Sequence, residues 1–97
     1  MYDVDGDGFL INRNQWDEEF MFYAAVQDGL ILNDGHIEYI KAARKMYEED
    51  GTVPSIREFA KSFGMDRKAK PLYELFESGV MKRIAKYGGL PKPTGCV

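Results

Sequence analysis

The residue best placed for chemistry is Cys96, the only cysteine in a chain of 97 residues. It follows two prolines and a glycine and is followed only by Val97. Structural cysteines are usually buried, whereas chain ends are usually exposed. No second cysteine is present to form an internal disulfide, and a thiolate is a strong nucleophile. We therefore predict that Cys96 is a reactive thiol and not a structural one.

The thiolate form of Cys96 needs nearby positive charge, because the carboxylate of Val97 repels it. Four cations stand on the same segment or on the helix predicted before it: Lys82, Arg83, Lys86 and Lys92. An extended segment would leave most of them out of range. We therefore expect full activation of the thiol only in the pocket of a partner protein.

The segment that carries Cys96 is predicted to be a flexible arm over residues 88–97, attached to a body of residues 1–87. Pro91 and Pro93 fix their own φ angles and favour an extended, semi-rigid spacer. Gly88 and Gly89 can end the preceding helix and act as a swivel. Such an arm would reach at most roughly 30 Å, enough to enter the active site of a partner.

The body is predicted to be an α+β domain, in which a small N-terminal β-hairpin packs on an array of about five helices. The Asp-Gly turn within residues 2–12 indicates the hairpin. Apolar residues at helical spacing, with caps and glycine stops, predict the helices. Their expected spans are residues 14–27, 34–49, 55–63, 72–76 and 78–87. The second and third of these form a helix-turn-helix-like pair.

Composition and charge narrow the class of protein. The content of hydrophobic residues is 44%, which suits one small globular domain over residues 1–97. Residues 1–50 hold twelve acidic and four basic side chains, whereas residues 51–97 hold four acidic and nine basic ones. This asymmetry fits either an anionic partner surface for the second half or a solvated charge pattern that binds no partner. A lone cysteine and the lack of an apolar span or signal peptide predict a cytoplasmic protein with no membrane contact.

The arm sequence GLPKPTGCV, Gly89–Val97, resembles the C-terminal arm of the DsrC/TusE family of sulfur-relay proteins. The similarity continues through the body, at Gly8–Leu10, Trp16, His36, Pro54–Arg57, Lys61, Leu72–Phe76 and Lys82. It covers essentially the whole chain, and the arm motif is highly specific.

This resemblance implies a sulfur carrier that accepts persulfide sulfur on Cys96 and relays it to an acceptor enzyme, in tRNA 2-thiouridine synthesis. It would be a sulfurtransferase in the relay sense, with no substrate pocket and no cofactor. The implied partners are an upstream sulfur-donor protein and a downstream thiolating enzyme with its tRNA, or a sulfite reductase. The residues expected to form the arm and dock partners are Gly89, Leu90, Pro91, Lys92, Pro93, Thr94, Gly95, Lys82, Arg83, Arg57 and Lys61.

A second hypothesis within the same family is a DsrC-like partner or regulatory subunit of dissimilatory sulfur metabolism. The DsrC branch is expected to carry a second arm cysteine where this chain has Ala85. Chemistry that needs two thiols in one chain is therefore excluded for this sequence. The one-cysteine pattern resembles the TusE branch.

A third hypothesis, from another class, is a helix-turn-helix regulator that binds nucleic acid. The third predicted helix offers only Arg57 and Lys61 on its outward face, beside Glu58. A reader of DNA needs several phosphate contacts and base-edge donors. We therefore expect no direct DNA binding.

Two further motifs suggest metal binding, and we predict no metal site at either. Asp3, Asp5 and Asp7 match the first half of a calcium-binding loop, but Asn14 stands where the bidentate glutamate belongs. His36 has no second histidine or nearby cysteine to complete a site. A capping or partly buried histidine at the start of a helix is the favoured interpretation.

Overall fold

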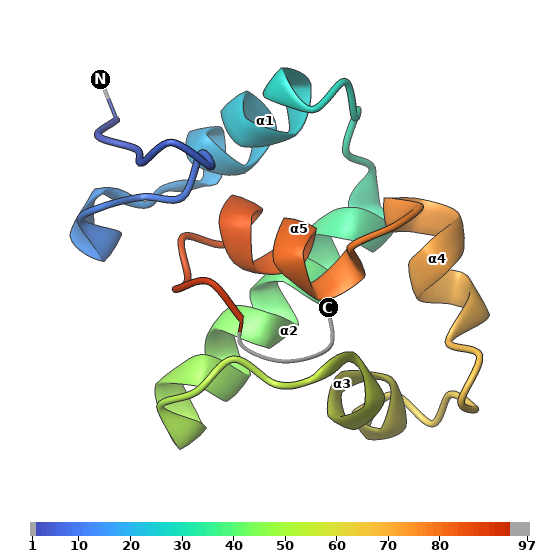
Figure 1. Ribbon diagram of the computed structural model, residues 1–97. Helices are drawn as coiled ribbons and strands as arrows, with labels where there is room; N and C mark the ends of the chain where they lie inside the picture. Colours follow the sequence, from blue (N-terminus) through green and yellow to red (C-terminus); the bar gives the residue numbers. More distant parts are fainter. Residues whose placement is uncertain (1, 94–97) are drawn as a thin grey trace.

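The computed structural model describes residues 2–93, and its last helix, α5, lies among three of the other helices (Figure 1). In chain order the elements are η1 (Arg13–Gln15), α1 (Glu18–Gln27), α2 (Asp34–Asp50), α3 (Ile56–Ser62), α4 (Lys70–Phe76) and α5 (Val80–Tyr87). Helix α5 contacts α1, α2 and α4. The segment expected to carry the reactive thiol therefore leaves the body from its central helix.

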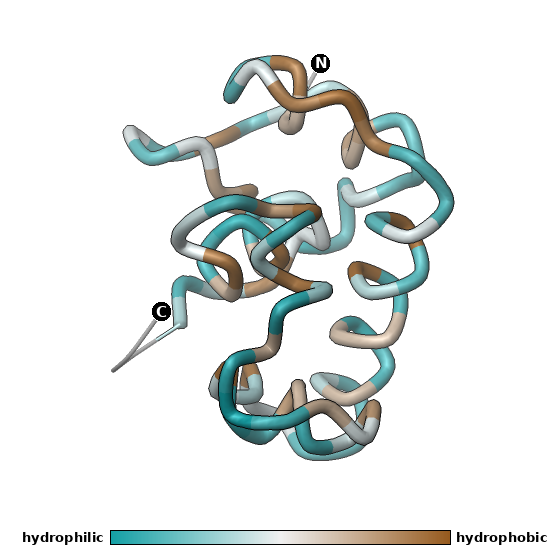
Figure 2. Tube along the Cα trace, turned by 90° about the vertical axis from the view of Figure 1, so that its right-hand side faces the viewer, coloured by the Kyte–Doolittle hydropathy of each residue, from teal (hydrophilic) through white to brown (hydrophobic). Residues whose placement is uncertain are grey.

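Apolar residues at helical spacing explain the central place of α5. Val80, Met81, Ile84, Ala85 and Tyr87 are all fully buried. Burying a side chain of valine size or larger contributes about 1.5–3 kcal/mol, so this face strongly favours the interior. Apolar and hydrophilic residues alternate along the helices in Figure 2, as expected when one face of each packs inward.

The ends of α2 and α3 follow their sequence signals. The side chain of Asn33 accepts hydrogen bonds from Gly35 and His36 at the start of α2, and Gly51 ends this helix in the left-handed region. Ser55 and Glu58 form a capping box at the start of α3. The spans of α2 and α3 agree with the predicted ones. The caps determine where each helix begins, because they bind backbone N–H groups that have no partner within the first turn.

The predicted α+β fold with an N-terminal hairpin is wrong, because residues 2–93 contain helices and no β-strand. Within the described part of the chain one antiparallel bridge forms, between Val4 and Leu10. The side chain of Asp5 accepts hydrogen bonds from the backbone amides of Asp7 and Phe9. These local bonds compete with the hydrogen bonds between strands that a β-hairpin needs. The amide of Asp3 donates to the side chain of Gln15 (2.9 Å), which prevents further pairing.

The first long helix also differs from the prediction, since α1 begins at Glu18 and not near Asn14. The side chain of Asn12 caps η1 by accepting from the amide of Asn14, and Asp17 caps α1 by accepting from Phe20. Two capping residues within five positions therefore divide the predicted helix. Trp16 lies between η1 and α1, so the helical spacing of α1 does not fix the direction of its side chain.

The helix-turn-helix-like pair, α2 and α3, is held by aromatic contacts. The ring of Tyr39 on α2 meets Phe63 edge-on at 4.9 Å between centroids, and Phe59 meets Phe63 at 5.1 Å. Such pairs contribute beyond the area they bury. The helix pair is thus a packing unit of this body. None of the helices within residues 2–93 combines the length and the apolar character needed to cross a bilayer.

Candidate functional site

The root of the predicted arm is locked onto the end of α5. The amide of Leu90 donates to the carbonyl of Ala85 (2.9 Å) and that of Gly89 to Lys86 (3.3 Å), with Gly89 in the left-handed region. This is a Schellman motif, the common glycine-based helix end. Leu90 is only 3% exposed. Gly88–Leu90 are therefore bonded to the end of α5, and the division into a body of residues 1–87 and an arm of residues 88–97 stays a prediction.

The side chains of Trp16 and Arg44 pack around this root of the arm. The indole Nε1 of Trp16 donates to the carbonyl of Tyr87 (2.9 Å), and the guanidinium of Arg44 donates to the carbonyl of Gly88. The same guanidinium stacks over the Trp16 ring at 3.6 Å from its centroid. Burial lowers the pKa of Arg44, yet the group remains a cation. Carbonyls at the end of α5 thus receive donors from two other parts of the chain.

The next part of the arm is tied to the acidic N-terminal turn. The ammonium of Lys92 pairs with Asp7, lies 3.7 Å from Asp5 and sits 5.7 Å from the centroid of the Phe9 ring. The hydrogen bond from Lys92 lowers the pKa of Asp7, and the same bond raises the pKa of Lys92. The backbone amide of Phe9 lowers the pKa of Asp5, with a smaller effect from Lys92. The turn that resembles half a calcium loop therefore binds an arm lysine.

A second carboxylate, Asp28, is paired beside the root. Lys86 donates to it at 2.8–3.0 Å, and the hydroxyl of Tyr87 donates at 2.8 Å. Burial raises the pKa of Asp28, but these two donors outweigh burial and bring it below its ordinary value. Burial, with the bond to Asp28, raises the pKa of Tyr87. Lys86 is thus engaged inside the body and is not a free cation for the thiol.

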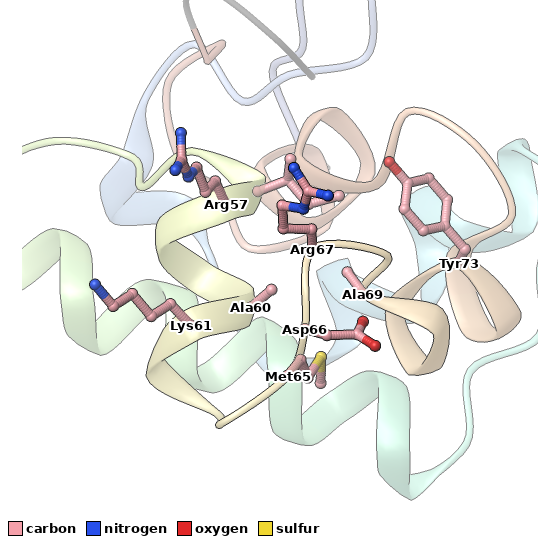
Figure 3. Close-up of a pocket in the computed structure, with 9 residues that line it drawn as sticks. Arg57, Ala60, Lys61, Met65, Asp66, Arg67, Ala69 and Tyr73 are labelled. Atoms are coloured by element: carbon pink, nitrogen blue, oxygen red, sulfur yellow. The ribbon is translucent and has the colours of Figure 1, made fainter.

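The predicted docking cations fall into two groups. Lys82 is exposed and Arg83 half-buried on α5, next to the arm root, and neither forms an ion pair within residues 2–93. Arg57 and Lys61 lie on α3 instead, where they line a groove of about 690 Å³ against α4 (Figure 3). The structure does not bring the two groups into one site.

The arm residues themselves are only partly described. Pro91 and Pro93 are half-buried, and together with Lys92 they line a small pocket with Tyr47 and the loop after α2. Thr94, Gly95 and Cys96 lie outside the described residues. Ala85, where the resemblance to the DsrC branch implies a second cysteine, is fully buried in α5.

The capping interpretation of His36 is confirmed. Its Nδ1 accepts the amide of Asn33 (3.0 Å), so Nε2 carries the hydrogen that donates to the carbonyl of Leu75 (2.7 Å). This imidazole therefore ties the start of α2 to α4. Among residues 2–93 no group of three potential ligands is arranged to hold a metal ion.

Comparison with known proteins shows the family to which a chain with this geometry belongs. The family model described as DsrC like protein matches residues 1–97. The chain belongs to the DsrC-like family. It is 38% identical over 97 residues to the dissimilatory-type sulfite reductase subunit gamma of Nitratidesulfovibrio vulgaris, covering 99% of this chain and 90% of that relative. It is 35% identical over 100 residues to the sulfurtransferase TusE of Yersinia pseudotuberculosis, covering 98% and 93%.

Solved structures of DsrC proteins agree with this DsrC-like fold. The solution structure of Allochromatium vinosum DsrC superposes with a TM-score of 0.85 at 39% identity, covering 99% of this chain and 90% of that one. The oxidised gamma subunit from Archaeoglobus fulgidus gives 0.81 at 29% identity, covering 99% and 92%. The family resemblance predicted from the arm motif is confirmed over the full length.

Trp16 and Arg44 were not predicted as site residues. Trp16 falls within the helix predicted over residues 14–27, whereas α1 begins after it, at Glu18. Arg44 stands between Ile40 and Tyr47, on the inward side of α2, and a lone arginine there was a signal for a buried carbonyl or ring partner. Their pairing joins residues far apart in sequence, which periodicity within one helix does not reveal.

Proposed function

We propose that this DsrC-like protein is a sulfur carrier, in which Cys96 accepts sulfur as a persulfide and passes it to an acceptor enzyme. One observation carries the proposal. The chain is similar over nearly its full length to proteins named sulfurtransferase TusE, and Cys96, in the arm motif, is its only cysteine. A single thiol suffices for relay, whereas it excludes a disulfide within the chain.

The transfer step balances without an added oxidant. The Cys96 thiolate attacks the outer sulfur of a donor persulfide, R–S–SH. A new S–S bond forms at Cys96, the donor S–S bond breaks, and the donor leaves as the thiolate R–S⁻. In the second step a nucleophile of the acceptor attacks the outer sulfur, and Cys96 leaves as a thiolate. The sulfane sulfur keeps its oxidation state through both steps.

The body's role is to fix where the reactive segment begins. Leu90 is buried and hydrogen-bonded, so the free length that can reach a partner is counted from Leu90 and not from Gly88. A fully extended chain from Leu90 to Cys96 reaches at most roughly 20 Å. Lys82 and Arg83, exposed or half-buried beside the root, are the cations placed to meet an acidic surface around a partner's entrance.

Within sulfur relay, we favour an acceptor that thiolates tRNA, as in the TusE branch. A sulfite reductase as partner is the second candidate, because the gamma subunit from N. vulgaris is 38% identical. The two differ in the chemistry demanded of this chain. Donating sulfur from a persulfide needs one thiol, whereas returning a bound sulfur as sulfide by internal disulfide formation needs two, and this chain has one.

Cys96→Ser tests the proposal. A donor protein carrying a radioactive persulfide is mixed with the wild-type or the variant chain, and label on each chain is measured after non-reducing separation. We expect labelling of the wild type only. The free energy of unfolding should change by less than about 0.5 kcal/mol, as for most surface substitutions. A labelled variant would overturn the assignment of Cys96, and a loss of several kcal/mol would make Cys96 structural.

A further inference from the structure

A groove between α3 and α4 combines cationic and apolar lining. Its walls come from α3, from the loop before α4 and from α4 itself (Figure 3). Ala60 and Ala69 are buried at its base, whereas Tyr73 is 45% exposed. The lining residues are Ile56, Arg57, Ala60, Lys61, Met65, Asp66, Arg67, Ala69 and Tyr73. The groove thus has an apolar base beneath charged side chains.

The loop that forms one wall is held by hydrogen bonds. The amide of Met65 donates to Ala60 (3.0 Å), and that of Ala69 donates to Asp66 (3.1 Å). The carboxylate of Asp66 accepts the amide of Lys68 (3.0 Å). A surface ordered before binding loses less entropy when a ligand docks. The groove is therefore present in the chain without a partner.

The charge of the lining is the clue to its ligand. Arg57, Lys61 and Arg67 stand against one carboxylate, Asp66. None of the three cations forms an ion pair with any residue from 2 to 93. In Figure 3 Arg57 projects from α3 and Arg67 from the loop before α4, whereas the ammonium of Lys61 points away from Arg67 and Tyr73. Cations on both sides of an apolar base are complementary to a chain segment that carries both carboxylates and an apolar side chain.

We propose that this groove binds an acidic peptide segment of a protein partner, with an apolar side chain of that segment seated between Ala60, Met65 and Tyr73. The inference rests on the proposed carrier function, for which it supplies a docking site away from the arm root. Arg57 and Arg67 would pair with carboxylates of the segment, and guanidinium groups suit such pairs because they can bind both oxygens.

Nucleic acid is the poorer match to the same surface. Tight binding to a phosphate backbone commonly uses six or more phosphate contacts, and affinity falls steeply with salt. Three cations beside a carboxylate can make fewer phosphate contacts than this. The alanines and the methionine at the base of the groove are apolar and do not bind phosphate. The apolar base and the mixed charge favour a peptide over an RNA or a DNA strand.

The test uses the full chain labelled with ¹⁵N and a short synthetic peptide in which glutamates are interspersed with leucines. Titration should shift the amide resonances of Arg57, Ala60, Met65, Arg67 and Tyr73. A peptide with lysines in place of the glutamates should not bind. Arg57→Glu/Arg67→Glu should weaken binding at least about tenfold, because two attractive pairs become repulsive.

A matched variant separates the groove from net charge. Arg13→Glu/Lys45→Glu changes the charge equally at two exposed positions outside the lining, and it should weaken binding by no more than about threefold. Equal losses in both variants would overturn the inference, and so would shifts confined to other surfaces. Oligouridine that displaces the peptide from these residues would make the groove a nucleic-acid site instead.

Loading of Cys96 by glutathione persulfide, measured on the same preparation, tests the carrier function separately, because this small donor has no acidic segment of the probe's length. Normal loading without peptide binding would overturn the groove inference and leave the carrier function intact. Peptide binding without loading would keep the groove and overturn the carrier function.

Discussion

At the residue scale, Gly89 is the position where local geometry is most demanding. Its φ of +68° lies in the left-handed region, and a Cβ built there would stand 2.6 Å from Cδ1 of Trp16. Gly51 has a similar φ of +74° but nothing within 4 Å of such a Cβ. The two glycines therefore separate the cost of the backbone conformation from the cost of the tryptophan contact.

Gly89→Ala and Gly51→Ala make this comparison directly. We expect Gly51→Ala to lower the free energy of unfolding by about 1–2 kcal/mol, the penalty of the left-handed region. Gly89→Ala should cost a further 1–3 kcal/mol or so, because Trp16 must move away from its hydrogen bond to Tyr87. Urea unfolding of both variants checks this, and equal losses would mean that Trp16 yields without cost.

At the element scale, the backbone bonds of the arm root distinguish Gly88–Leu90 from Lys92. The amides of Gly88, Gly89 and Leu90 all donate to carbonyls of α5, whereas no acceptor within residues 2–93 is found for the amide of Lys92. We expect the three amides of the root to exchange hydrogen as slowly as those of α5, and the amide of Lys92 to exchange faster.

The Trp16→Phe variant tests how far the hydrogen bond from Trp16 slows this exchange. The phenyl ring keeps much of the packing but loses the donor to the carbonyl of Tyr87, which leaves that carbonyl without the bond. The amide of Leu90 should then exchange faster, while amides of α3 stay as slow as before. Unchanged protection at Leu90 would show that the Schellman motif alone holds the root.

At the scale of the whole molecule, paired charges should confine stability to a window of pH. The pKa values of Asp5, Asp7 and Asp28 are lowered in the folded chain, so their contribution is present above the ordinary carboxyl value and is lost as the pH falls through the folded values. The pKa values of Lys92 and Tyr87 are raised in the folded chain. Their contribution to stability is therefore present below about pH 10 and is lost as the pH rises further.

Asp28→Asn tests the acidic side of this window. The variant weakens the bonds from Lys86 and Tyr87, and it should lower the free energy of unfolding by about 1–3 kcal/mol at neutral pH. The difference from the wild type should shrink as the pH falls below about 4, where Asp28 of the unfolded chain takes up a proton, and should be lost as the pH passes the lowered pKa of Asp28 in the folded chain. Urea unfolding across pH 2–8 measures it, and a difference that does not change with pH would refute this origin.

How far the sequence could predict this molecule depends on the range of each interaction. The capped ends of α2 and α3 were predictable, since Asn33, Ser55 and Gly51 act within a few residues. The hairpin prediction failed because the side chain of Asp5 competes for the same backbone amides. The pairing of Lys92 with Asp7 joins the two ends of the chain, and periodicity carries no signal for it.

The central claim, that Cys96 carries persulfide sulfur, is tested most directly by mass spectrometry of the intact chain after reaction with a persulfide donor. We predict an added mass of about 32 Da, one sulfur atom, located by peptide mapping to the peptide that contains Cys96 and removed by dithiothreitol. Cys96→Ser should gain no such mass. A wild-type chain that stays unmodified, or that forms only a mixed disulfide with the donor, would contradict the carrier function.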